Sequence, residues 1–193
     1  MRIEIVDSNE VTHVVGMSEI HNSNRFTQDE LLSLAKSLSS DSIVVQLMNG
    51  KLIADETHLL SAAQNALNAQ NGGYMLSRSL DVEIIVYASA QRQIGRALEE
   101  LGVYDDLEHI AAVTISSDKK TVEQTLRNMG EKIGPEFSNP FEASKERYDR
   151  IREHFKIEEK EISTFTESND VMERQKALSR CIVSRVSLVA FDS

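Results

Sequence analysis

The chain has 193 residues, of which 40% are hydrophobic and 27% charged, with only 2 Pro and 8 Gly. This composition is typical of one packed globular domain and excludes a disordered chain. The formal net charge is −10, from 21 Lys and Arg against 31 Asp and Glu, whereas a free-standing nucleic-acid binder is normally basic. Any contact with RNA must therefore be local or shared with a partner.

The sequence indicates a cytoplasmic protein that has no membrane partner. Cys181 is the one cysteine, so no internal disulfide can form and nothing indicates an oxidising compartment. Residues 1–10 turn acidic, unlike a signal or transit peptide. No apolar run approaches the length of a membrane span.

The N-terminal quarter is predicted to form a hairpin, a helix and a strand. Arg2–Val6 and Val11–Val15 are expected to be strands that flank a turn. Thr27 is the expected N-cap of the helix, because Glu30 stands three residues later and completes a capping box. The compact apolar run Ile43–Met48 predicts the next strand.

The middle of the chain is predicted to alternate helices with buried strands. Asp55 is the expected N-cap of a helix that ends near residues 71–73. The run Val82–Ala88 is apolar at almost every position and predicts a strand covered on both faces. Ser89 is expected to cap the helix after it, and Ile110–Ile115 predicts another buried strand.

The remainder of the chain is predicted to be helical. One helix is expected from about Asp118 to Met129, stopping at Gly130. Asn139-Pro140 has the pattern of an N-cap followed by proline at the first helical position. The closing segment predicts an amphipathic helix, although its end, Ser187–Phe191, is also compatible with a strand.

Together these elements predict an α/β fold. We expect a mixed β-sheet of about four to five strands flanked by helices. Residues 1–130 would form the α/β core, and residues 131–193 a helical C-terminal extension packed on it, as one domain overall.

The sequence lacks the common patterns of catalytic and cofactor sites. No phosphate-binding glycine loop follows a predicted strand, and Cys181 has no activating histidine nearby in the sequence. The five histidines lie in different elements, without the spacing of metal ligands: His13, His21, His58, His109 and His154. We therefore expect no catalytic residue, no metal and no cofactor, although carboxylates brought together from distant positions stay possible.

Two arginines stand out near the start of the helix predicted after Ala88. Arg92 and Arg96 would lie at its positive end, where cations are unfavourable, and would repel each other at a spacing of four. A bound anion would offset this cost. The candidate RNA- or anion-binding residues are Arg78, Ser89, Gln91, Arg92, Gln93 and Arg96.

An alternative involves no ligand at all. Arg96 could pair with Glu99 or Glu100 while Arg92 lies in water. Arg78 would lie about 20 Å away, at the other end of the predicted strand, and could serve a different surface.

The run from Arg78 to Ile94, followed by Ala97 and Leu101-Gly102, resembles the signature of the PRPK-binding-protein family. These proteins are the small non-catalytic subunits of the KEOPS tRNA-modifying complex in archaea and eukaryotes. The likeness extends to stretches within residues 52–63, 111–115 and 178–190 and covers about two thirds of the chain.

The resemblance implies a subunit without catalytic activity that binds the small atypical protein kinase of the KEOPS complex. It also implies help in bringing in tRNA, held by its CCA tail, for threonylcarbamoylation of the adenosine next to the anticodon. The kinase-docking candidates lie on the closing helix, whose apolar stripe could instead belong to the core: Leu178, Ile182, Arg185 and Val189. A rival function is a small enzyme or binding protein that holds a phosphorylated or carboxylate metabolite at the helix start after Ala88.

Overall fold

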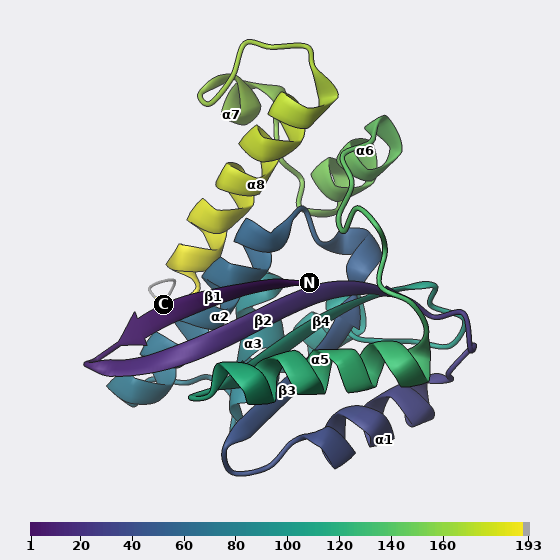
Figure 1. Cartoon of the computed structure of the whole chain (residues 1–193). Helices are drawn as coiled ribbons and strands as arrows, with labels where there is room; N and C mark the ends of the chain where they lie inside the picture. The colour runs from purple at the N-terminus through teal and green to yellow at the C-terminus, as the bar shows by residue number, and fades with distance from the viewer. Residues whose placement is uncertain (191–193) are drawn as a thin grey trace.

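A computed structural model describes residues 1–190, which build a four-stranded sheet with helices on both faces (Figure 1). The strand order is β1-β2-β4-β3, for β1 (Arg2–Ser8), β2 (Val11–His21), β3 (Ile43–Asn49) and β4 (His109–Ser116). The predicted α/β class is confirmed. All three strand pairings are antiparallel. The expected mixed sheet was wrong, because the predicted strand Val82–Ala88 does not join the sheet.

The β1–β2 hairpin is confirmed and is longer than predicted. Asn9 and Glu10 form its two-residue turn, and both have positive φ angles, 48° and 68°, as a hairpin turn of type I′ requires. Strand β2 continues to His21 because its second half pairs with β4, from Val14 opposite Ser116 to His21 opposite His109.

Helices cover both faces of the sheet and give the core two halves. On one face lie α1 (Gln28–Leu38) and α5 (Lys119–Ile133), and on the other lie α2 (Glu56–Gly72) and α3 (Leu80–Ala88). Strand β4 contributes side chains to both halves of the core. Ala111 and Val113 pack in one cluster and Ile110 and Ala112 in the other, because successive side chains of a strand point to opposite faces of the sheet.

The predicted helix starts are confirmed where a side chain caps the backbone. Thr27 Oγ1 accepts the amide of Glu30 at 3.3 Å, and the Glu30 carboxylate accepts the amide of Thr27 at 2.8 Å. Asp55 likewise accepts the amide of His58 at 2.9 Å. These local contacts explain why helix starts could be placed from the sequence.

Two predicted boundaries in the C-terminal half were wrong. Helix α5 runs past Gly130 and ends at Gly134, whose φ of 146° is open only to glycine. No helix starts at Asn139-Pro140, because Phe141 has a positive φ of 55° and donates its amide to Glu19.

The C-terminal helices stack beyond α2 and form the upper part of the molecule in Figure 1. They are α6 (Lys145–His154), the short α7 (Glu159–Ser163) and α8 (Val171–Leu188). The end of the closing segment is helical to Leu188, and Phe191, where a strand was the alternative, lies outside the described residues.

A buried ion pair fastens this C-terminal part to the sheet. Glu19 on β2 pairs with Arg147 on α6, with 2.5 Å between Oε1 and Nη2, and both side chains are almost completely buried. Arg147 Nη1 also donates to the carbonyls of Gly50 and Ile53, at 3.0 and 2.9 Å. Glu19 accepts a further bond from His109 at 2.9 Å.

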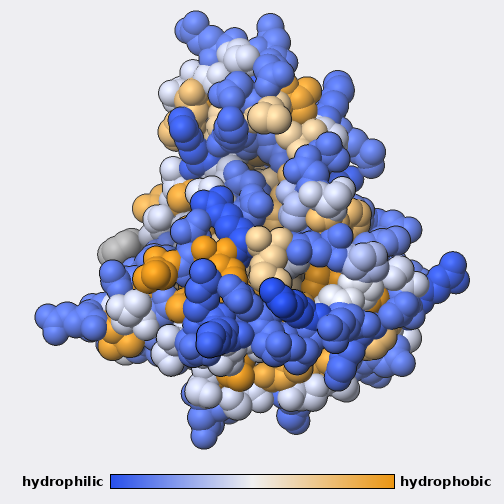
Figure 2. All heavy atoms as spheres, viewed as in Figure 1, coloured by the Kyte–Doolittle hydropathy of each residue, from blue (hydrophilic) through white to orange (hydrophobic). Residues whose placement is uncertain are grey.

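The surface is polar over most of the face shown in Figure 2, where hydrophobic residues gather only in small separate groups. Within residues 1–190, no helix has the length and apolar character that crossing a membrane requires.

Candidate functional site

Several of the predicted site residues line one cleft of about 320 Å³. The cleft lies where the connection from α3 to α4 (Ile94–Leu101) meets the end of α6 and the flank of α8. Its lining brings together residues far apart in the sequence: Ser89, Ala90, Gln91, Arg96, Glu100, His154, Phe155, Lys156 and Arg185. We call this space the α3–α4 cleft.

The prediction of a strand at Val82–Ala88 was wrong, because these residues belong to helix α3 (Leu80–Ala88). Helix α3 is apolar on nearly all sides because it packs against α2, β3, α4 and α8, and such a helix has no periodicity to separate it from a buried strand. Asp81 and Glu83 lie in its first turn, where carboxylates favour a helix.

Ser89 ends α3 and does not cap a following helix. The amides of Ala90 and Gln91 donate back to the carbonyls of Tyr87 and Val86, at 2.9 and 3.3 Å, with Ala90 left-handed at φ 52°. This is a Schellman helix end. Its left-handed position carries Ala90, so the usual glycine signal is missing from the sequence.

Arg92 occupies a favourable position, contrary to the prediction. It follows the C-terminal end of α3, and its Nη1 donates to the carbonyl of Val189 at the end of α8, at 3.1 Å. Cations at the C-terminal ends of helices are stabilised by the helix dipole. Arg92 therefore has no unfavourable interaction with a helix dipole that a bound anion would have to offset. The alternative, in which Arg92 only lies in water, was also wrong, because the side chain donates to Val189.

Arg96 lies in the first turn of α4, where its Nε donates to Glu100 at 2.9 Å. This is the ion pair that the alternative anticipated. The helix start after Ala88, on which the metabolite-binding hypothesis rested, does not exist, since α4 begins at Ile94 after its N-cap Gln93. That hypothesis has lost its geometric basis.

The cleft nevertheless gathers positive charge in an acidic protein. Lys156 is exposed and makes no ion pair among residues 1–190. Arg185 donates to the carbonyl of Phe155 and pairs with Glu161 at 3.0 Å. Burial lowers the pKa of His154, partly countered by Glu100, so His154 contributes little positive charge at neutral pH.

A neutral buried histidine connects the wall of the cleft to α2. His58 Nε2 lies 2.8 Å from the carbonyl of Ala88, and Nδ1 accepts the amide of Ala54 at 3.3 Å. Since a carbonyl only accepts, Nε2 carries the proton. Burial lowers the pKa of His58, so the neutral ring holds the end of α3 in place.

Arg78 lies at the other end of α3, just before its N-cap Ser79. Nine helical residues span only about 13 Å, so Arg78 and the cleft are closer than a strand would have placed them. The loop that carries Arg78 is held by the fully buried Glu83, which accepts the amides of Leu76 and Ser77 at 3.0 and 2.7 Å.

The apolar docking candidates on α8 belong to the core. Leu178, Ile182 and Val189 are buried against α2, α3 and their neighbours, as the alternative for this stripe anticipated. They are not available to a partner in this structure. Of the four α8 candidates only Arg185 reaches the surface, at the α3–α4 cleft.

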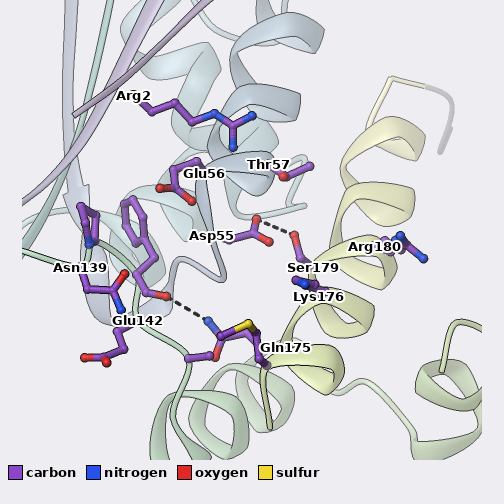
Figure 3. Close-up of a pocket in the computed structure, with 14 residues that line it drawn as sticks. Arg2, Asp55, Glu56, Thr57, Asn139, Glu142, Gln175, Lys176, Ser179 and Arg180 are labelled. Atoms are coloured by element: carbon purple, nitrogen blue, oxygen red, sulfur yellow. Dashed lines mark hydrogen bonds between the residues drawn. The ribbon is translucent and has the colours of Figure 1, made fainter. Parts of the chain in front are cut away.

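A larger cavity, of about 490 Å³, was not foreseen from the sequence (Figure 3). It lies between the start of α2, the loop at residues 139–143 and the first half of α8. No short motif marks it, because its walls come from three separate segments of the sequence.

Comparison with known proteins gives two matches. A family model described as kinase binding protein CGI-121 matches residues 17–190. A protein of Methanocaldococcus jannaschii named regulatory protein Cgi121 is 32% identical over 113 residues, which are 58% of this chain and 70% of that protein.

Proposed function

The chain belongs to the kinase binding protein CGI-121 family, and from this premise we propose that it is the non-catalytic kinase-binding subunit of a KEOPS complex. In this role it binds the small atypical kinase of the complex and helps recruit tRNA, through the CCA tail, for threonylcarbamoyladenosine formation next to the anticodon. The observation that carries the proposal is the family match, which runs from β2 to the end of α8.

The α3–α4 cleft supports a local contact with RNA. Arg96, Lys156 and Arg185 line it, and Arg92 stands on the adjoining connection. Phosphate groups are bound by such clusters of guanidinium and ammonium groups. Because the chain carries a net charge of −10, the rest of the surface would repel RNA, and a contact here would be weak unless a partner contributed.

Reversing the charge of both arginines tests this contact. We expect Arg92→Glu with Arg96→Glu to reduce retention of tRNA about tenfold or more, as loss of charge-assisted hydrogen bonds implies. Melting temperature should fall by only a few degrees, because both side chains are exposed and each makes a single hydrogen bond, Arg92 to Val189 and Arg96 to Glu100. Filter binding of labelled tRNA to the chain assembled with its kinase measures the effect, with intact tRNA and with tRNA that lacks the CCA tail.

A control with the same change in net charge separates a local contact from general repulsion. Lys120 and Arg127 are exposed on α5, on the opposite face of the sheet from α3. Lys120→Glu with Arg127→Glu should leave tRNA retention within about twofold of the wild type, as an effect screened over distance would. Equal losses in both double variants would remove the cleft from the proposal.

A further inference from the structure

Strand β1 is an edge strand of the sheet, and no further strand pairs with it among residues 1–190 (Figure 1). The direction of its backbone groups follows from its neighbour β2, whose other side is covered by β4. On the β1 side of β2, the amide of His21 donates to the carbonyl of Pro135 at 2.9 Å. Because backbone groups alternate along an antiparallel strand, the odd-numbered residues of β2 form their hydrogen bonds toward β1.

Several backbone groups on the outer side of β1 have no partner. Odd-numbered residues of β2 lie opposite even-numbered residues of β1, so Ile3, Ile5 and Asp7 direct their amides and carbonyls away from the sheet. The carbonyl of Asp7 accepts Gln64 Nε2 of α2 at 3.2 Å. The outward groups of Ile3 and Ile5 make no hydrogen bond among the described residues, so they can pair with another strand.

The sheet protects its opposite edge but leaves this one open. At β3, Gln46 Nε2 donates to the carbonyl of Leu47 at 2.7 Å, and Val45 and Leu47 are each only 2% exposed. Natural sheets guard exposed edges with lysine, proline or a bulge. Strand β1 contains neither lysine nor proline and pairs with β2 without a bulge. Its one cation, Arg2, is paired with Glu4 at 2.7 Å.

The side chains along the open edge suit a strand that is aliphatic and basic on one face. Ile5 is 70% exposed, and Asp7 lies two residues further along the same face. The Asp7 carboxylate accepts the Thr12 hydroxyl at 2.8 Å and has no cationic partner among the described residues. Aliphatic pairs and pairs of opposite charge stabilise neighbouring strands.

Helix α2, under the other face of β1, brings no further charge to the edge. Asn68 Oδ1 accepts the Ser8 hydroxyl at 2.8 Å, so this helix lies close to β1. After Glu56 its exposed and partly exposed polar side chains are all uncharged: Thr57, Ser61, Gln64, Asn65, Asn68, Gln70 and Asn71. A segment added here therefore needs no charged residue on the α2 side.

We propose that the open edge of β1 binds an extended segment of a partner protein, which joins the four-stranded sheet as a further antiparallel strand. An aliphatic residue of the segment lies opposite Ile5, and a lysine or arginine two positions before it lies opposite Asp7. In strand addition, main-chain hydrogen bonds supply affinity and alternate side chains supply specificity. This surface is separate from the α3–α4 cleft and does not depend on the proposed role in tRNA recruitment.

Hydrogen exchange of the full chain, followed by ¹⁵N NMR, tests the pairing with the peptide acetyl-TKTVTVT-amide. At ten times its dissociation constant the peptide should slow exchange of the Ile3 and Ile5 amides about tenfold, because only the free fraction exchanges. The amides of Glu4 and Val6 already bond to β2 and should change by less than about twofold. This alternation distinguishes strand addition from contact with side chains alone.

Two lysine substitutions with the same chemical change locate the surface. Ile5→Lys should weaken binding of the peptide about tenfold, because it removes the aliphatic pair and places a guarding cation on the edge. Leu32 is the matched control, since it is 50% exposed on α1, which packs against β3. Leu32→Lys should leave binding within about twofold of the wild type.

A charge exchange tests the position opposite Asp7. Asp7→Lys should weaken binding of acetyl-TKTVTVT-amide about threefold and strengthen binding of acetyl-TETVTVT-amide by a similar factor. The proposal is overturned if the peptide leaves exchange of Ile3 and Ile5 unchanged, if the two lysine variants lose equally, or if the charge exchange does not reverse the preference. Protection of both amides in the chain alone, rising with its concentration, would assign the edge to a second copy and also overturn it.

Discussion

Replacing Arg147 with alanine is expected to lower the free energy of unfolding by about 3–5 kcal/mol, the usual cost of leaving a buried charge unpaired. Arg147 is the cationic partner of Glu19 and donates to two carbonyls near the start of α2. Burial alone would raise the pKa of Glu19, but His109, the charge of Arg147 and the amide of Phe141 together hold it below its ordinary value. Without Arg147 this balance is lost.

Urea unfolding at pH 7, followed by circular dichroism, measures the effect. Arg150→Ala is the matched control, because Arg150 lies on the same helix but is partly exposed, pairs with the exposed Glu146 and donates one hydrogen bond to the carbonyl of Lys51 at 3.0 Å. It should cost about 1 kcal/mol. The double variant Glu19→Gln with Arg147→Met should recover part of the loss, since it removes both buried charges. Similar losses for Arg147→Ala and Arg150→Ala would show that the buried pair does not fasten the C-terminal part.

The second large effect concerns Leu178, which was a candidate for docking the kinase and is fully buried in the structure. We expect Leu178→Ala to lower the free energy of unfolding by about 2–5 kcal/mol, the range for a leucine truncated inside a core. At a temperature where the variant is still folded, its affinity for the kinase should be unchanged. Denaturant unfolding and a binding isotherm with the kinase measure the two quantities separately.

Leu188 on the same helix is the matched control, with 52% of its surface exposed. Leu188→Ala should alter stability by no more than about 0.5 kcal/mol. If Leu178→Ala instead leaves stability intact and weakens kinase binding, Leu178 is not buried in the core of the free protein.

The parts of the fold that were predictable depend on contacts local in the sequence. The Thr27 capping box, the Asp55 cap and the turn after β1 each involve residues within four positions of one another. Their residue types report the local conformation directly. The strands β3 and β4 were also placed to within one residue at either end, because turn or cap residues flank each apolar run.

The elements that were wrongly predicted depend on tertiary packing. Val82–Ala88 has β-branched residues and no polar face, and only its burial among α2, α4 and α8 makes it a helix. The turn at Phe141 exists because Glu19, more than a hundred residues away, takes its amide. Neither contact leaves a pattern in the neighbouring sequence.

The candidate sites show the same division. Residues of the motif from Ser89 to Arg96 do line a cleft, but the predicted cost of Arg92 was wrong, because Arg92 lies at the C-terminal ends of α3 and α8, where a cation is favourable. Lys156 and His154 were missed because they reach the cleft from α6 and its end. Gln175, which lines the larger cavity, gave no sequence signal, because its amide donates to the carbonyls of Ala54 and Phe141, which lie far from it in the sequence.

Size-exclusion chromatography of the purified chain mixed with the purified small atypical kinase of the proposed KEOPS complex tests the central claim most directly. The account predicts co-elution as a stable complex, which retains intact tRNA better than tRNA without its CCA tail. Separate elution of the two proteins at micromolar concentration would contradict it.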